Sequence, residues 1–210
     1  EVPLNADEAY RLVVNNGKVT VEAVTEHGVY WAMQTLAQLQ DVQKKKATFN
    51  GCSIVDWPAF RIRGFMQDVG RTYMSIEELK REIAVLSRFK INVFHWHLTE
   101  NQSWRLQSKI FPMLNDSVNT TRMPGKYYTL EEAKDLVAFC KAHNILLIPE
   151  FDMPAHALAI TRAFPNLMTK EAGGNHKYLI EELDIRKDGA LDAARSEERR
   201  VGKECRSRWS

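Results

Sequence analysis

The sequence predicts an α/β fold, in which strands and helices alternate along most of the chain. Residues 58–151 show the order strand, helix, strand, helix, strand, which indicates a parallel sheet. The third strand is nearly all apolar, as expected for a parallel strand covered on both faces. Polar side chains follow the end of every strand, where barrel enzymes build their active sites. We therefore predict the first part of a (β/α)8 (TIM) barrel, preceded by the end of a small α+β domain.

The α+β segment lies before residue 58. The alternating apolar runs Tyr10–Val14 and Val19–Thr25 flank the sequence Asn-Asn-Gly at residues 15–17, a hairpin signal because these residues tolerate positive φ. A helix is predicted over Gly28–Gln40, and Lys44–Lys46 forms a charged break after it. The apolar face of this helix is predicted to contain Val29, Met33, Leu36 and Leu39.

The barrel segment begins with a predicted strand at Phe60–Met66. Ser75 opens a helix, and Glu78 three residues later completes a capping box. A second strand is predicted over Ile91–Leu98. The predicted apolar stripe of the helix contains Ile76, Leu79, Ile83, Leu86 and Phe89.

A long loop from about residue 99 to 128 precedes the second helix. Thr129 and Glu132 form another capping box, and the third strand is predicted over Ile145–Phe151. The apolar face of this helix is predicted to contain Leu130, Ala133, Val137 and Cys140. An open doubly wound sheet is the alternative, but a dinucleotide-binding sheet would need a G-x-G-x-x-G turn where the sequence has Gly-Arg-Thr-Tyr at 70–73.

The polar residues at the three strand ends are the candidate site. They are Asp68 and Arg71, then His97 and Glu100, then Glu150, Asp152 and His156. The Arg71 guanidinium could bind two neighbouring acceptors such as sugar hydroxyls, or it could form a structural pair with Asp68. Glu150 and Asp152 share a face, so they are either an acid/base pair or hydrogen-bonded scaffold groups.

His95 and His97 lie two residues apart and so point to the same side of a strand. An H-x-H pair also starts the metal site of several barrel metallohydrolases. The alternative is that both are structural core histidines.

Composition and charge exclude several classes of protein. No apolar run approaches the roughly 18 residues of a membrane helix. The three cysteines are widely spaced and predict neither a disulfide framework nor a zinc site. Residues 195–210 (RSEERRVGKECRSRWS) carry six basic and three acidic residues, and without them the chain has 23 basic and 24 acidic residues. No basic field for nucleic acid therefore exists outside this tail.

The tail itself has two interpretations. It could be a basic nucleic-acid-binding arm. Its sequence, however, resembles the translation of a common sequencing adapter, so we expect foreign sequence and exclude residues 195–210 from the fold.

Taken together, several strings resemble glycoside hydrolase family 20, the β-N-acetylhexosaminidases. The resemblance covers roughly residues 58–168, and residues 1–50 also resemble the end of the α+β domain that precedes the barrel in that family. The motifs are RGFMQDVGR (63–71), INVFHWHLTENQSWR (91–105), Phe-Pro (111–112), the Tyr-Thr helix start (128–129) and IPEFDMPAH (148–156).

The resemblance implies retaining hydrolysis of terminal β-linked N-acetylhexosamine, GlcNAc or GalNAc, without a metal or cofactor. In this family the acetamido oxygen of the substrate attacks the anomeric carbon, an exception to the two-carboxylate scheme. By resemblance, Arg71 grips the sugar hydroxyls, and Glu100 orients His156 beside the general acid. Glu100 stands where many members have Asp, and Ala155 where they usually have Gly, which would carry strain at positive φ.

The family's catalytic Asp-Glu pair follows the fourth strand, and no such pair appears after residue 167. We therefore expect a fragment that is inactive by itself, with domains at 1–57 (α+β), 58–194 (truncated barrel) and 195–210 (artefactual tail). The family is usually exported, so we expect a periplasmic, extracellular or lysosomal parent protein. Its partners are expected to be N-acetylhexosamine-terminated glycans, with no nucleic acid and no membrane span.

Two other functions stay open. One is a barrel metal-dependent hydrolase that uses His95 and His97. The other is a non-enzymatic glycan-binding relative of the same fold.

Overall fold

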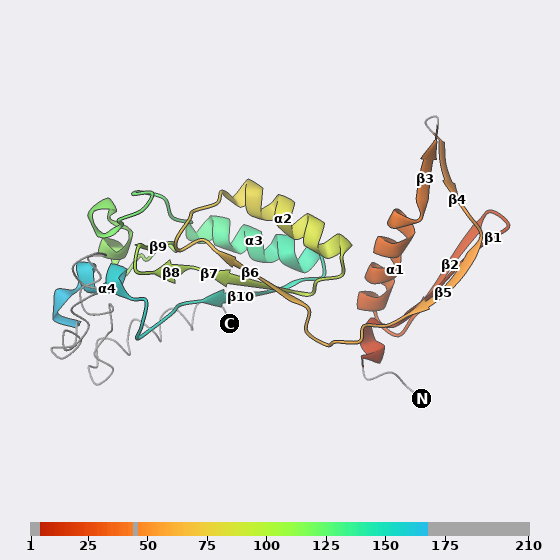
Figure 1. Ribbon diagram of the computed structural model, residues 1–210, viewed down its shortest axis with the longest axis horizontal. Helices are drawn as coiled ribbons and strands as arrows, with labels where there is room; N and C mark the ends of the chain where they lie inside the picture. Colours follow the sequence, from red (N-terminus) through yellow and green to blue (C-terminus); the bar gives the residue numbers. More distant parts are fainter. Residues whose placement is uncertain (1–4, 44–45, 168–210) are drawn as a thin grey trace, which may run out of the picture. The chain divides into compact units, whose positions relative to one another are not determined.

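A computed structural model describes residues 5–43 and 46–167 (Figure 1). The chain forms two compact units. Of the described residues, the first unit contains those from Asn5 to Phe65 together with Lys80–Phe94 and Phe139–Leu146, and the second contains Met66–Leu79, His95–Ala138 and Leu147–Leu167. No helix in these described ranges is long and apolar enough to cross a membrane.

The first unit contains an antiparallel sheet with strand order β2-β1-β5. Asn16 and Gly17 have φ of 49° and 73°, which confirms the predicted hairpin turn between β1 and β2. A second antiparallel pair, β3–β4, was not predicted; of the predicted charged break at Lys44–Lys46, Lys46 begins β4, and residues 44–45 lie outside the described residues. The strands are β1 (Tyr10–Asn15), β2 (Lys18–Ala23), β3 (Gln40–Gln43), β4 (Lys46–Phe49) and β5 (Cys52–Asp56).

The helix of this unit, α1 (Glu26–Gln38), buries largely a different face from the one predicted, and of the four predicted residues Leu36 packs against the core of the unit. Val29 and Met33 are 43% and 49% exposed, whereas Trp31 and Ala32 are buried. A Cβ on Gly28 would lie 2.4 Å from the Ala9 carbonyl oxygen, so only glycine allows this side of the helix to approach so closely. Periodicity failed here because α1 is apolar on more than one side, and the close approach decides which side packs.

A buried glutamate ties the start of this unit to the residues just before the first barrel strand. Glu8, in the short 3-10 helix η1 (Ala6–Glu8), accepts a hydrogen bond from Trp31 Nε1 at 2.6 Å and pairs with Arg63. Asn92 Nδ2 donates to the other Glu8 oxygen at 3.1 Å. Every partner comes from a distant part of the sequence, so no local pattern indicated this network.

The barrel strands form a three-stranded sheet with order β10-β7-β6. The backbone N–H of Asn92 donates to the carbonyl oxygen of Arg63 just before the two strands begin. The backbone N–H of Val69 donates to the carbonyl oxygen of His97 where the strands end. The start of β6 thus pairs with the start of β7 and the end with the end, so the two strands are parallel, as predicted. The strands are β6 (Gly64–Asp68), β7 (Val93–His97) and β10 (Leu146–Glu150).

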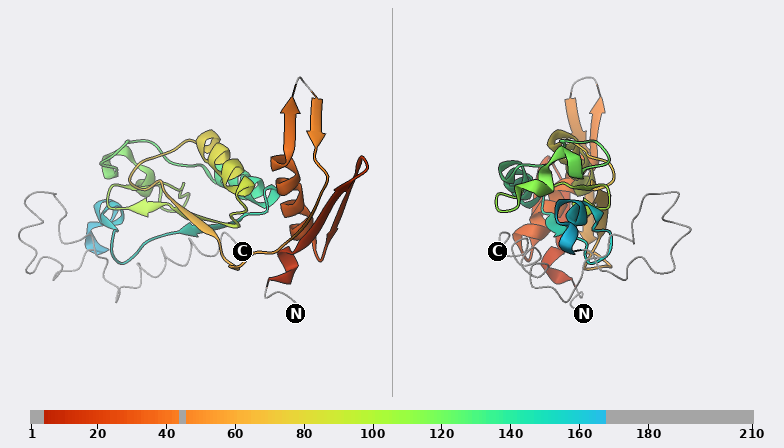
Figure 2. Two further views of the ribbon diagram at one scale, coloured as in Figure 1. Left: turned by 45° about the vertical axis from the view of Figure 1, so that its right-hand side comes forward. Right: turned by 90° about the vertical axis from the view of Figure 1, so that its left-hand side faces the viewer.

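The first and third strands differ from the prediction. β6 begins at Gly64 rather than residue 60, and Phe60 and Ile62 are 74% and 72% exposed. In β10, Leu146 and Ile148 are 62% and 44% exposed, so the strand is not covered on both faces by the described residues. The helices α2 and α3 lie on one face of the sheet (Figures 1 and 2), and side chains that alternate along a strand point to both faces.

Both predicted capping boxes are confirmed. The Ser75 amide donates to Glu78 Oε2 at 2.7 Å, and the Glu78 amide donates to Ser75 Oγ at 3.3 Å. Thr129 and Glu132 make the same reciprocal pair at 2.7 and 3.1 Å. These caps start α2 (Ile76–Arg88) and α3 (Leu130–Ala142) where the sequence predicts.

The apolar stripes of these helices are confirmed in part. Ile76, Leu79 and Ile83 of α2 are buried, but Phe89 lies past the end of the helix and is 74% exposed. In α3, Ala133, Leu136 and Cys140 are buried, and Leu136 was not predicted.

The predicted long loop contains its own structure. A short hairpin joins β8 (Thr99–Glu100) and β9 (Ser103–Trp104), and 3-10 turns follow. Trp104, Leu114 and Ile160 belong to one apolar cluster, so the loop packs against α4. The remaining elements are η2 (Pro112–Asn115), η3 (Ser117–Asn119), α4 (Leu158–Ala163) and η4 (Pro165–Leu167).

We predict that Cys140 resists alkylation in the folded protein while Cys52 reacts. Cys140 is buried and Cys52 is partly accessible. Burial raises the pKa of the Cys140 thiol to about 12, so about one thiol in 10⁴ is ionised at pH 8. Peptide mass spectrometry after iodoacetamide treatment at pH 8 measures both sites, with urea-denatured protein as the control. Equal labelling of the two cysteines in the folded protein contradicts the burial of Cys140.

Candidate active site

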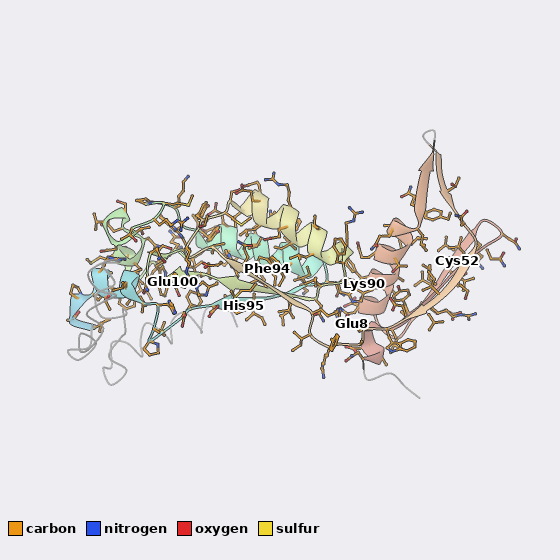
Figure 3. All side chains as sticks on the ribbon, viewed as in Figure 1. Glu8, Cys52, Lys90, Phe94, His95 and Glu100 are labelled. Carbon is orange, nitrogen blue, oxygen red and sulfur yellow. The ribbon has the colours of Figure 1, made fainter. Side chains whose placement is uncertain are left out.

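The predicted site residues meet at the carboxyl ends of β6, β7 and β10, in the second unit. Asp68 and Arg71 follow β6, Glu100 follows β7, and His156 follows β10. Figure 3 labels Glu100 and His95 on this part of the chain. Because parallel strands end at the same edge of a sheet, residues far apart in sequence come into contact here.

Arg71 is paired with a carboxylate and still accessible. Its Nη1 donates to Asp68 Oδ2 at 2.6 Å, and the Asp68 Oδ1 accepts from the Arg71 amide at 3.0 Å. Burial raises the pKa of Asp68, but the two hydrogen bonds from Arg71 outweigh it and hold the pKa below its usual value. The bond to Asp68 raises the pKa of Arg71. The Arg71 side chain remains 45% exposed, so the two sequence-based alternatives, structural pair and ligand-binding group, are compatible.

Glu100 is the buried centre of the site. Its side chain is 2% exposed, and its Oε1 accepts a hydrogen bond from His156 Nδ1 at 2.7 Å. Arg71 Nη2 lies 3.1 Å from the other oxygen, Oε2. The extra methylene of Glu relative to Asp therefore does not prevent contact with His156.

Gly70 allows Glu100 to occupy this position. A Cβ at Gly70 would lie 2.9 Å from the Glu100 Cβ and 3.2 Å from the Thr99 carbonyl carbon. Such contacts are too close for any residue other than glycine without movement of the β8 backbone.

The strain expected at Ala155 is instead found at the next residue. His156 has a φ of +53°, and Ala155 is not among the described residues with positive φ. Strain at Ala155 was expected only if its φ were positive, and the sequence alone does not determine φ. An imidazole held at positive φ is uncommon, and such conformations are concentrated at functional sites.

His95 and His97 share one carboxylate. His95 Nε2 and His97 Nδ1 each lie 2.7 Å from Glu150 Oε2, which confirms that the two histidines point to the same side of β7. Glu150, at the end of β10, is therefore hydrogen-bonded to a side chain of the neighbouring strand β7. Asp152 is positioned nearby by its amide, which donates to Thr99 Oγ1 at 2.8 Å.

Within residues 5–43 and 46–167, no group of three His, Cys, Asp or Glu side chains is arranged to hold a metal ion. The metal alternative for His95 and His97 therefore has no third ligand in this part of the chain. Their nearest carboxylate is a hydrogen-bond partner of both rings.

Arg105 was not singled out from the sequence, but it organises the loops around the site. It is fully buried, and its guanidinium donates only to backbone carbonyls. The acceptors are Val69, Gly70, Arg122, Met123 and Lys126. The loop that carries Arg71 is thereby attached to residues 122–126. A lone arginine just after a strand is the only sequence signal, and it does not distinguish this role from a surface charge.

A parallel sheet with polar side chains gathered at the carboxyl ends of its strands is typical of barrel enzymes. Residues 60–198 match the catalytic domain of glycosyl hydrolase family 20, and residues 2–57 match domain 2 of the same family. The chain belongs to glycosyl hydrolase family 20.

The chain is similar to several β-hexosaminidases and related enzymes. A β-hexosaminidase of Porphyromonas gingivalis is 39% identical over 77% of this chain and 22% of its own length, and one of Vibrio furnissii is 33% identical over 80% and 30%. The crystal structure of an exo-β-N-acetylglucosaminidase from Vibrio harveyi with N-acetylglucosamine aligns with a TM-score of 0.73 and 36% identity, covering 78% of this chain and 28% of that one. The chain thus spans less than a third of the length of these three relatives.

The tail at 195–210 lies outside the described residues, as does the region where the sequence lacks an Asp-Glu pair.

Proposed function

We propose that this chain supplies the sugar-binding part of a β-N-acetylhexosaminidase, which removes terminal β-linked GlcNAc or GalNAc from glycans. The observation that carries the proposal is the Arg71–Glu100–His156 arrangement at the strand ends of a family 20 barrel. The relatives named β-hexosaminidase support the same substrate class. We also propose the boundaries 1–57, 58–194 and 195–210 for the α+β domain, the barrel segment and the foreign tail.

The proposed mechanism gives each residue a separate task. Arg71 has N–H donors that do not face Asp68 or Glu100, and a planar guanidinium can donate to two adjacent sugar hydroxyls at once. Hydrolysis proceeds with retention, because the substrate's own acetamido oxygen attacks the anomeric carbon.

His156 acts beside the general acid. Its Nδ1 donates to Glu100, so its Nε2 is left to face a neighbouring group. A carboxylate–histidine pair of this kind tunes the protonation of an adjacent acid. We place the acid and the carboxylate that orients the acetamide outside the described residues, because the resemblance puts this Asp-Glu pair after the fourth barrel strand and the described barrel sheet contains three strands.

The test is a full-length enzyme that carries this chain, assayed on an aryl N-acetyl-β-glucosaminide with and without a chelator. We expect turnover that the chelator leaves unchanged, because the proposed chemistry uses side chains and the substrate acetamide. Residues 1–210 expressed alone are the matched control and are expected to show no turnover. Loss of activity that added zinc restores would instead support the metallohydrolase, and glycan binding without turnover in the full-length protein would support the non-enzymatic relative.

Export of the enzyme is part of the same proposal. Activity in the culture medium, the periplasm or a lysosomal fraction supports it, and activity confined to the cytosol contradicts it.

A further inference from the structure

Glu150 joins two histidines that the proposed mechanism does not use. Its Oε2 lies 2.7 Å from both His95 Nε2 and His97 Nδ1. The two rings differ in burial, because the His95 side chain is 37% exposed and that of His97 is 7% exposed. A buried imidazole with one nitrogen on a carboxylate has a fixed orientation, so its second nitrogen also points in a fixed direction.

The second nitrogen of His97 faces Glu100. His97 Nε2 lies 3.9 Å from Glu100 Oε2. Both atoms are buried, and neither has a hydrogen-bond partner in the described part of the chain. Arg71 Nη2 forms an ion pair with the same oxygen at 3.1 Å. Since a buried polar atom without a hydrogen bond is costly, these two atoms gain from a small approach to each other.

The chemistry of the pair allows that approach. A carboxylate oxygen only accepts hydrogen bonds, so His97 Nδ1 carries the hydrogen and is the donor in its hydrogen bond to Glu150. One further proton, on either His97 Nε2 or Glu100 Oε2, then makes a hydrogen bond between them. Hydrogen bonds that are long in a free active site commonly shorten when the substrate is bound.

We propose that His97, held by Glu150, is a positioning residue that fixes the Glu100 carboxylate and, through it, the His156 ring. The inference rests on the proposed function of the Glu100–His156 pair. Because the His156 side chain is 47% exposed, its hydrogen bond to Glu100 is the polar contact that restrains the ring. A rotation of the Glu100 carboxylate would therefore move His156 Nε2 away from the acid it serves.

A double-mutant cycle in the full-length enzyme tests this inference. His97→Gln is expected to lower kcat about 10-fold with little change in KM, and to have almost no further effect in a His156→Ala background, because coupled residues are not additive. Glu150→Gln should act in the same direction. His95→Gln is the matched comparison, since His95 contacts the same Glu150 oxygen without facing Glu100, and its effect on kcat should be smaller.

Two controls separate this role from a structural one. Glu131→Gln, at an exposed position of α3, should leave the kinetics unchanged. Thermal denaturation of every variant shows whether the fold is intact. Additive losses from His97→Gln and His156→Ala, or equal effects of His95→Gln and His97→Gln, overturn the proposal.

A measurement without turnover covers the case in which the full-length protein has no hexosaminidase activity, which would contradict the proposed function itself. The ¹⁵N chemical shifts of the His156 ring should change in His97→Gln and not in Glu131→Gln. An unchanged His156 signal in His97→Gln overturns the positioning role whatever the activity.

Discussion

Replacing Arg71 with alanine is expected to lower kcat/KM of the full-length enzyme by roughly 2–4 kcal/mol, about 30- to 1,000-fold, as for the loss of a charged hydrogen-bond donor to substrate. Two contacts hold the guanidinium in place, one to Asp68 at 2.6 Å and one to Glu100 at 3.1 Å. Its position is therefore set before the sugar binds, so little of the interaction energy is lost to ordering the side chain. Steady-state kinetics on an aryl N-acetyl-β-glucosaminide measure the change.

Two further variants test whether Arg71 acts by binding the substrate. Arg71→Lys keeps the charge but loses the planar fork, so it should recover only a small part of the activity. Arg81→Ala removes an exposed arginine from α2 and should leave kcat/KM unchanged. If Arg71→Ala behaves like Arg81→Ala, the guanidinium is a structural partner of Asp68 and does not bind substrate.

His156→Ala is expected to lower kcat about 100-fold while KM changes little, because His156 serves the acid and does not grip the sugar. The basic limb of the pH profile of kcat should also move, since that limb reports loss of the proton from the general acid. Glu100→Gln should produce a smaller change in the same direction, because the amide can keep one hydrogen bond to the His156 ring.

Some results for the His156 and Glu100 variants would contradict the proposed role of this pair. Near-wild-type kcat in both, with an unchanged pH profile, would remove the pair from the mechanism. A rise in KM with constant kcat would instead place His156 on the substrate. Thermal denaturation is needed for Glu100→Gln, because Glu100 is buried and a change there can also alter stability.

The most accurate predictions from the sequence concern features that depend only on residues close together in the chain. The capping boxes at Ser75 and Thr129 span three residues each, so their hydrogen bonds need only local backbone geometry. The turn at Asn16 is similar, because positive φ is a preference of the residues themselves. The starts of α2 and α3 followed from the capping boxes.

The residues of the candidate site were predicted, and the resemblance also implied that Glu100 contacts His156, but the carboxylate shared by His95 and His97 was not predicted. The order of strands and helices places Arg71, Glu100 and His156 at one edge of a sheet, because parallel strands end together. The motifs by themselves indicate family 20. The hydrogen bond from His156 to Glu100 crosses 56 residues, and that from His97 to Glu150 crosses 53. No spacing rule reaches so far.

The sequence by itself therefore determined the family, the alternation of β6, α2, β7, α3 and β10, the starts of α2 and α3 and the residue types at the strand ends, since each follows from periodicity, local hydrogen bonding or a motif. The tertiary structure alone decided which face of α1 is buried, that Glu150 is the carboxylate beside both His95 and His97, and how Arg105 joins the loops. The physical reason is that side-chain partners are chosen by close packing and by the need to satisfy buried polar atoms. Both conditions depend on the three-dimensional positions of distant residues, as the contact of Gly28 with Ala9 and that of Gly70 with Glu100 illustrate.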